Sequence, residues 1–115
     1  GNASEAAKVI ETLAKNNPDN LDAHLLLSQL YFFQNKYQES LNSLDVILKA
    51  AKQSGIKRSL LLRSTIYTTL CLYYLNDQAN LKAFKEYLMS AAEPQEIDKI
   101  IQEEGLESHW QKIIQ

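Results

Sequence analysis

Apolar positions along the chain recur with helical spacing, and only a few turn-forming residues interrupt them. In the first segment Ala6, Ala7, Ile10, Leu13 and Ala14 fall three or four residues apart, which is the spacing of one face of an α-helix. The same kind of pattern predicts about seven helices, at residues 4–16, 21–34, 37–53, 57–75, 81–92, 94–104 and in the closing segment LESHWQKII. No run alternates cleanly between apolar and polar residues as a strand would. The pattern therefore predicts an all-α protein.

The expected helix ends coincide with the residues that break helices. Pro18 cannot continue the first helix, and Asp19 or Asn20 can cap the second. Gly55 suits the end of the third helix, and Pro94 suits the first turn of the sixth. The apolar stretch that begins at His24 is broken by Gln-Asn-Lys after about three turns, well short of the roughly 20 residues that span a bilayer. We expect no membrane span.

Two sets of packing residues repeat along the chain. Ala6, Ile10 and Leu13 recur 34 residues later as Ser40, Leu44 and Ile47, and these recur 43 residues on as Ala83, Tyr87 and Ser90. In the alternate helices His24, Leu27, Ser28 and Tyr31 recur 43 residues later as Tyr67, Leu70, Cys71 and Tyr74. A small residue allows two helix axes to approach, and larger neighbours fill the space beside the contact. The recurrence indicates stacked helix pairs.

This pattern resembles the tetratricopeptide repeat, whose signature is W-x2-L-G-x2-Y, then A-x3-F, then a proline. The first full copy is His24-x2-Leu27-Ser28-x2-Tyr31 with Ser40-x3-Leu44, and the second is Tyr67-x2-Leu70-Cys71-x2-Tyr74 with Ala83-x3-Tyr87. The resemblance implies a right-handed α-α superhelix in a single domain over residues 1–115, with repeat-bearing helices at about 4–92 and capping helices at about 94–114. The two full copies stand nine residues further apart than the standard period, which implies longer helices between residues 49 and 63.

What the resemblance implies about function is protein binding. In this family the first helix of each pair lines a concave face that holds a peptide or a helix. The lining residues that it implies here are Asp22, Leu25, Leu26, Gln29, Phe32, Phe33, Thr65, Thr68, Thr69, Leu72, Leu75 and Asn76. Members that clamp a chaperone's C-terminal carboxylate use Lys, Arg and Asn, and that clamp is absent, so the face suits an apolar or helical segment.

The expected function is thus a non-catalytic protein–protein interaction module or scaffold. Two alternatives stay open from the sequence. One is a regulatory sensor domain that binds a peptide effector in the groove. The other is an extracytoplasmic lipoprotein accessory in complex assembly. The chain does not begin with Met, so we expect a fragment or the mature part of a longer protein, and its localisation is unknown from the sequence.

Residues that could carry chemistry are sparse. His24 and His109 lie 85 residues apart, Cys71 is the only cysteine, and no glycine-rich phosphate loop occurs. We therefore expect no catalytic residue, no metal site and no cofactor. Cys71 is expected to be a buried thiol and His24 a packing residue. The carboxylates of Glu103, Glu104 and Glu107 are expected to be solvated at a helix end.

The charge is nearly balanced overall but unevenly distributed. With 12 basic and 14 acidic residues the net charge is −2, which argues against a nucleic-acid partner. Residues 46–76 contain five basic side chains and no acid, whereas six acids lie between Glu93 and the C-terminus. Either these two segments complement each other within the chain, or the basic one docks an acidic partner or lipid headgroups.

The apolar faces of the two C-terminal helices must be buried somewhere. These faces consist of Ile97, Ile100, Ile101, Trp110, Ile113 and Ile114. Terminal repeats of a solenoid need a cap, so we expect these helices to cover the end of the stack. The alternative is that they dock onto a second copy and give a homodimer.

Overall fold

The computed structural model describes residues 2–114 and contains seven helices over that range. They are α1 (Asn2–Asn16), α2 (Leu21–Phe33), α3 (Tyr37–Ser54), α4 (Arg58–Tyr74), α5 (Gln78–Ala91), α6 (Pro94–Glu104) and α7 (Glu107–Ile114). No strand occurs among these residues. The all-α helical repeat fold predicted from the sequence is confirmed, and α3 and α4 are the long helices that the extended spacing implied.

Most helix ends follow the local chemistry of the sequence. The Asn20 side chain accepts a hydrogen bond from the Ala23 backbone N–H at 3.1 Å and caps α2. Gly55 and Gly105 have φ of 77° and 69°, a conformation that costs glycine little. The start of α5 differs from the prediction by three residues. Asp77 accepts a hydrogen bond from the Asn80 N–H, so the segment predicted as a break already forms the first turn.

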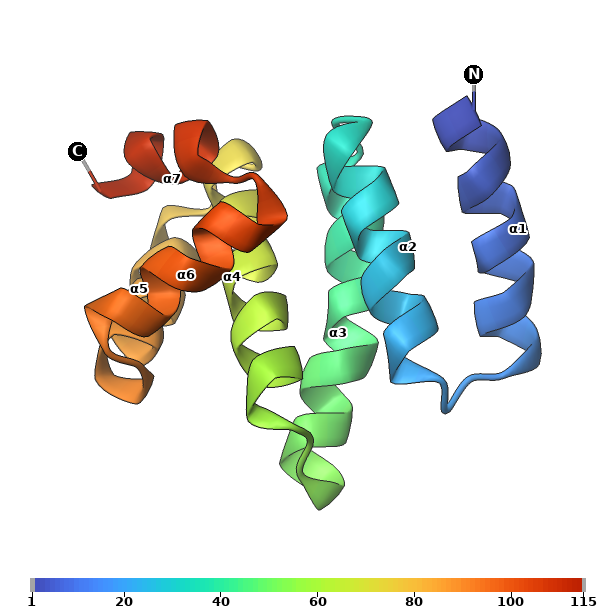
Figure 1. The fold of residues 1–115 in the computed structure, drawn as a ribbon, viewed down its shortest axis with the longest axis horizontal. Coiled ribbons are helices and arrows are strands. Elements are labelled where there is room, and N and C mark those ends of the chain that lie inside the picture. The colour runs from blue at the N-terminus through green and yellow to red at the C-terminus, as the bar shows by residue number, and fades with distance from the viewer. Residues whose placement is uncertain (1, 115) are drawn as a thin grey trace.

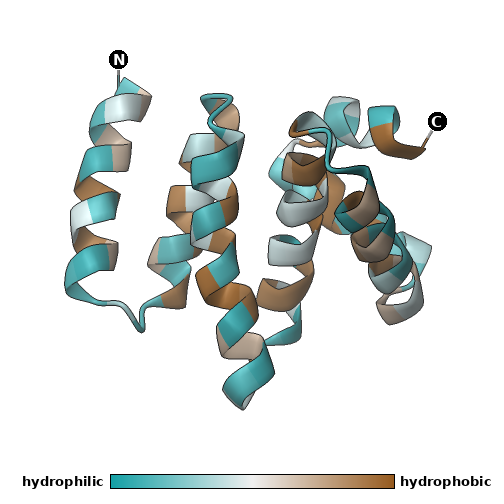
Figure 2. Ribbon diagram, turned by 180° about the vertical axis from the view of Figure 1, so that it is seen from behind, coloured by the Kyte–Doolittle hydropathy of each residue, from teal (hydrophilic) through white to brown (hydrophobic). Residues whose placement is uncertain are grey.

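The helices form a row in which α4 is enclosed on several sides (Figure 1). α1 to α5 follow one another across the molecule, and α6 crosses in front of α4. The main core gathers around Leu44 and Ile47 of α3, Ile66 and Leu70 of α4, and Leu88 of α5, all fully buried. A smaller apolar cluster joins α1 to α2. Figure 2 shows hydrophobic and hydrophilic residues alternating along the helices.

The C-terminal helices bury their apolar faces within the chain itself. Ile97, Ile100 and Ile101 of α6 and Trp110 and Ile113 of α7 belong to the main core. Ile114 was expected on the same face, but it is exposed, because the next helical residue after Ile113 turns by about 100° away from the core. None of the helices described is both long and apolar enough to cross a membrane.

The basic and acidic segments meet in the fold. The Arg58 guanidinium donates hydrogen bonds at 2.8 and 2.7 Å to the two carboxylate oxygens of Glu96. Arg63 pairs with Glu103 and Glu104, each at 2.7 Å. Of the two interpretations of the charge distribution, intrachain complementation is the one seen at these residues.

The two full repeats are offset by 41 residues, and the predicted offset of 43 is wrong. Asn35 and Asn76 have matching positive φ of 63° and 59° in the turns after α2 and α4. The same backbone hydrogen bond closes both turns, from Lys36 to Tyr31 at 2.9 Å and from Asp77 to Leu72 at 3.0 Å.

Burial on α5 supports the same register. Buried Ser40 and Ile47 of α3 correspond at this offset to buried Leu81 and Leu88. The residues expected at those packing positions were Ala83, Tyr87 and Ser90, and all three are exposed. Residues of the second repeat therefore correspond to those of the first at an offset two residues shorter than the sequence predicted. Each repeat position on α4 then falls on a different side of that helix.

Candidate functional site

The α2 part of the predicted concave face is only partly open. Asp22, Leu26 and Phe33 are exposed, Leu25 and Gln29 are half-buried, and Phe32 is buried. Leu26 and Phe33 lie seven residues apart, with Asp22 four residues before Leu26, so the three side chains share one face of α2. We call Asp22, Leu26, Gln29 and Phe33 the α2 stripe.

Most of the α4 part of the predicted face is buried in helix packing, although Thr65 also lines a groove between α3 and α5. Thr65, Thr68, Thr69 and Leu72 are buried. The reason is the two-residue shift in register, which places these four residues at the packing positions of the repeat. Thr65 accordingly lies beside residues of both α3 and α5, and the Thr69 hydroxyl donates to the Thr65 carbonyl at 2.7 Å.

Leu75 and Asn76, the last two predicted residues, are exposed at the end of α4. Asn76 belongs to the turn that connects α4 to α5 and takes a positive φ there. The structure thus leaves the predicted set divided between an exposed stripe, a buried group and a turn.

The other side of α4 is covered by the chain's own C-terminal helices. Arg63 and Tyr67 of α4 reach Glu104 at the end of α6, and the Tyr74 hydroxyl shares a hydrogen bond with Nδ1 of His109 in α7. These are the α4 side chains that the corrected register turns toward the predicted concave face. That face is therefore filled along α4 from Tyr67 to Tyr74.

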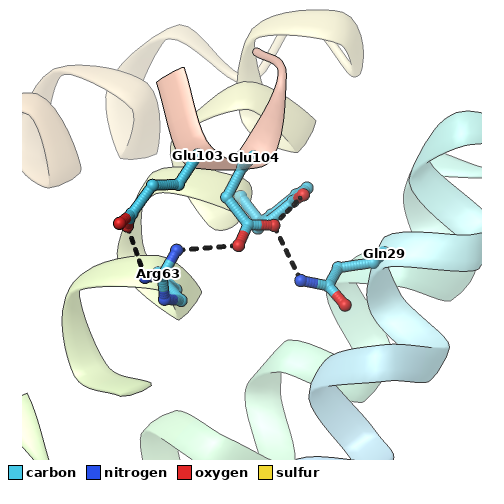
Figure 3. Close-up of polar contacts among 5 residues, drawn as sticks. Gln29, Arg63, Glu103 and Glu104 are labelled. Carbon is cyan, nitrogen blue, oxygen red and sulfur yellow. Dashed lines mark hydrogen bonds and ion pairs between the residues drawn. The ribbon is translucent and has the colours of Figure 1, made fainter. Parts of the chain in front are cut away.

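Glu104 joins three helices at one carboxylate (Figure 3). Its Oε1 accepts hydrogen bonds from the Gln29 amide at 2.8 Å and the Tyr67 hydroxyl at 2.7 Å, while its Oε2 accepts from Arg63 at 2.7 Å. We call this group the Glu104 junction. The expectation of solvated charge is wrong for Glu104, whose side chain is only 15% exposed, whereas Glu107 is exposed as expected.

Burial and hydrogen bonding at the Glu104 junction shift the pKa values of Tyr67 and Glu103 in opposite directions. Burial, and then the hydrogen bond to the Glu104 carboxylate, raise the pKa of Tyr67 well above its ordinary value, so the phenol stays a donor. The hydrogen bond from Arg63 lowers the pKa of Glu103. The junction is thus a set of mutually satisfied groups, which is the arrangement that holds a structure together and leaves no free base or nucleophile.

Phe32 is part of an aromatic cluster beneath this junction. Its ring lies 5.5 Å from those of Tyr37 and Tyr67 and 5.1 Å from that of His109, between centroids. Tyr37 stacks on Tyr74 at 4.6 Å. Desolvation, and then the charge of Lys112, lower the pKa of His109. Sequence reasoning assigned Phe32 to the binding face because it could not place α7, which closes this cluster.

Two of the open hollows on the surface lie beside α4. One, of about 570 Å³ and lined by both polar and apolar residues, lies between the starts of α2 and α4 and includes Asp22, Leu25 and Arg63. An apolar groove of about 390 Å³ lies on another side, between α3 and α5 with α4 as its floor, and is lined in part by Phe84 and Tyr87. The sequence analysis missed this groove because the earlier register treated Tyr87 as a core residue.

Cys71 and His24, the other residues whose side chains could take part in chemistry, lie in packed surroundings. Cys71 is buried, as expected, and burial raises the pKa of its thiol to about 11. His24 is half-buried, with Nε2 lying 3.1 Å from the Pro18 carbonyl oxygen. Among residues 2–114, no three His, Cys, Asp or Glu side chains come together in a way that could hold a metal ion.

Comparison with known protein families gives a match over the first half of the chain. A family model described as "Tetratricopeptide repeat" matches residues 1–61, which span α1, α2, α3 and the first residues of α4. No curated protein sequence matches the chain, and no solved structure does.

Proposed function

The chain belongs to the tetratricopeptide repeat family, whose repeats generally mediate protein–protein interactions, and from that premise we propose that it binds a peptide or helix of a partner protein through the α2 stripe. The family is typically non-catalytic. The proposed module acts by docking and requires no cofactor. The partner segment contacts Leu26 and Phe33 with apolar side chains, and Asp22 provides a polar contact at the same face.

The observation that carries this proposal is the exposure of two large apolar side chains on one face of α2. Leu26 is 43% exposed and Phe33 is 55% exposed. Single exposed apolar residues are ordinary, but neighbouring ones on a continuous face are typical of interaction surfaces. Gln29 lies between them and already donates a hydrogen bond to Glu104. Leu26 and Phe33 are therefore the residues of the stripe whose exposed surface can contact a partner.

The Glu104 junction limits the length of segment that such a face can hold. From Leu26 to Phe33 the helix rises roughly 10 Å. Beyond it, the corresponding face of α4 is occupied by α6 and α7. The proposed partner segment is therefore short, about two helical turns, and it lies on the α1 side of the junction.

Paired substitutions test the proposal. Leu26→Lys with Phe33→Lys should abolish capture of specific partners from an extract of the encoding organism, with partners identified by mass spectrometry. The matched control is Val46→Lys with Met89→Lys, because these two apolar residues are also exposed (37% and 50%) but lie on α3 and α5. Equal capture by both variants would contradict the proposal, as would equal loss. Circular dichroism should show unchanged helicity in each.

A further inference from the structure

The extra length of α3 and α4 builds the apolar groove between α3 and α5. α3 has 18 residues against 15 in α1, and at the 41-residue offset α4 begins four residues earlier than α2. Ala51 and Lys52 lie in the last turn of α3 and Leu61 lies in the added turn of α4, and all three line the groove. The wide spacing of the two repeats thus produces a surface feature that the proposed function does not involve.

The groove and the Glu104 junction lie on different sides of α4. Leu61 and Thr65 line the groove, whereas Arg63 and Tyr67, each two positions further on, reach Glu104. Two positions on a helix differ by about 200°. Because α3 and α5 both pack against α4 (Figure 1), the walls of the groove belong to consecutive helices inside the row and not to an end of it.

The first repeat has a larger side chain at the position that forms the floor of the groove. Thr65 corresponds at the 41-residue offset to His24, whose Nε2 lies 3.1 Å from the Pro18 carbonyl oxygen, so its ring extends from α2 toward the connection after α1. Thr65 is shorter, and its hydroxyl donates to the Leu61 carbonyl of its own helix at 2.7 Å. A threonine here leaves open the space that a histidine ring would occupy.

The groove has the size of a site for a small molecule. Its volume of about 390 Å³ falls within the roughly 300–1,000 Å³ of small-molecule sites. The lining runs over residues 48–52, 61–65 and 83–87, which is a rise of about 6 Å along each helix. A helix that docks in a groove places anchors over about two turns, so this groove suits one compact apolar group instead.

The lining combines apolar walls with one free cation. Half-buried Leu48, Leu61 and Phe84 and exposed Tyr87 provide most of the apolar surface. Lys52 is the charged residue of the lining, and it makes no ion pair within residues 2–114. The lining residues include no Asp or Glu. An apolar body therefore gains by leaving water, and a negative charge on it is favoured over a positive one.

We propose that the groove between α3 and α5 binds a small organic anion with an apolar body, of the class of medium-chain carboxylates. The alkyl body lies against Leu48, Leu61 and Phe84, and the carboxylate faces the Lys52 ammonium at the rim. This site shares no residue with the α2 stripe, so it is a second binding activity that is independent of the proposed partner.

Titration with octanoate tests the site, and octylammonium is the matched cation of equal chain length. Binding is followed through the backbone amide signals in two-dimensional NMR spectra of the full chain. We expect half-saturation at roughly millimolar octanoate, as for a ligand of this size, with the shifts concentrated at residues 48–52, 61–65 and 83–87. Octylammonium should bind at least about fivefold more weakly, because repulsion from Lys52 replaces attraction.

Paired substitutions separate binding in the groove from general adsorption. Ala83→Phe introduces a ring from an exposed wall position and should abolish octanoate binding, whereas Ala6→Phe, at an exposed alanine of α1, should preserve it. Lys52→Gln should weaken octanoate binding by about threefold to fivefold and reduce the preference over octylammonium. Lys82→Gln removes the same charge beside a different hollow on α5 and should preserve both.

Three results of the titration would overturn the inference. They are no saturation within about tenfold of the expected concentration, equal affinity for octanoate and octylammonium, and binding that survives Ala83→Phe. Octanoate binding that disappears when the chain is part of a longer natural polypeptide would also overturn it, because a segment of that polypeptide would then cover the groove. The capture experiment on the α2 stripe changes none of these residues, so either proposal can fail while the other stands.

Discussion

Replacement of Glu104 with alanine tests how the C-terminal helices are held over α4. The substitution removes the acceptor of three hydrogen bonds from Gln29, Arg63 and Tyr67. Hydrogen bonds to a charged group contribute about 1.5–3 kcal/mol each, without being additive, and breaking one side of a buried ion pair costs about 3–5 kcal/mol. Because the side chains of Glu104 and Arg63 are 15% and 23% exposed, we expect the lower end, about 3 kcal/mol.

Glu103→Ala is the matched control, since Glu103 pairs with the same arginine at the same distance of 2.7 Å. Its side chain is 44% exposed, and exposed pairs contribute about 0–1 kcal/mol. Urea unfolding followed by circular dichroism at neutral pH, with the slope m shared between variants, gives both values. The reasoning is refuted if the two substitutions cost the same, or if Glu104→Ala costs less than about 1 kcal/mol.

Three further predictions concern the core. Leu88→Ala should cost about 2–5 kcal/mol of unfolding free energy and Tyr87→Ala far less, measured by urea unfolding; the opposite order would restore the 43-residue register. Because desolvation lowers the pKa of His109 from its ordinary 6.5, the unfolded chain binds the proton first, so stability should fall as pH drops through that value. His109→Gln should flatten this part of the stability profile, and an unchanged profile would contradict the assignment. Cys71, with a buried thiol of pKa about 11, should resist a thiol reagent at pH 8 until urea unfolds the chain; rapid labelling of the native protein would disprove its burial.

The helices and their ends could be predicted because their determinants are local. Pro18, Gly55, Pro94 and Gly105 act within a turn of their own positions, and each lies at a helix boundary in the structure. The predicted 34-residue relation between α1 and α3 is met only in part, because Ser40 and Ile47 are buried whereas their counterparts Ala6 and Leu13 are exposed, and α1 buries Ala7 and Ala14 instead. These features depend on residues a few positions apart, which a single sequence displays directly.

The register of α4 could not be predicted from its residues alone. Thr69 and Cys71 are both small and lie two positions apart, so either can serve where two helix axes cross. What decides between them is the docking of α6 and α7 on the side that carries Tyr67 and Tyr74. The side of α4 that carries Tyr67 and Tyr74 is therefore covered and cannot hold a ligand. Thr65, Thr68 and Thr69, which were expected in a groove, are buried in the core.

The role of Glu104 was hidden for a related reason. Its partners Gln29, Arg63 and Tyr67 are 75, 41 and 37 residues away. A carboxylate near a helix end has the local appearance of a solvated group, and only the path of the chain brings three donors to it. The uneven charge of the two segments was the one signal that pointed to this contact.

The central claim is that a partner docks on the α2 stripe, and site-specific photo-crosslinking tests it most directly. A photoreactive phenylalanine analogue is placed at Phe33, at Tyr87 in the apolar groove, and at Val46 as an exposed control. The account predicts a specific protein adduct from Phe33 and only background from Val46. Adducts from Tyr87 with none from Phe33 would contradict it and place the partner in the groove between α3 and α5.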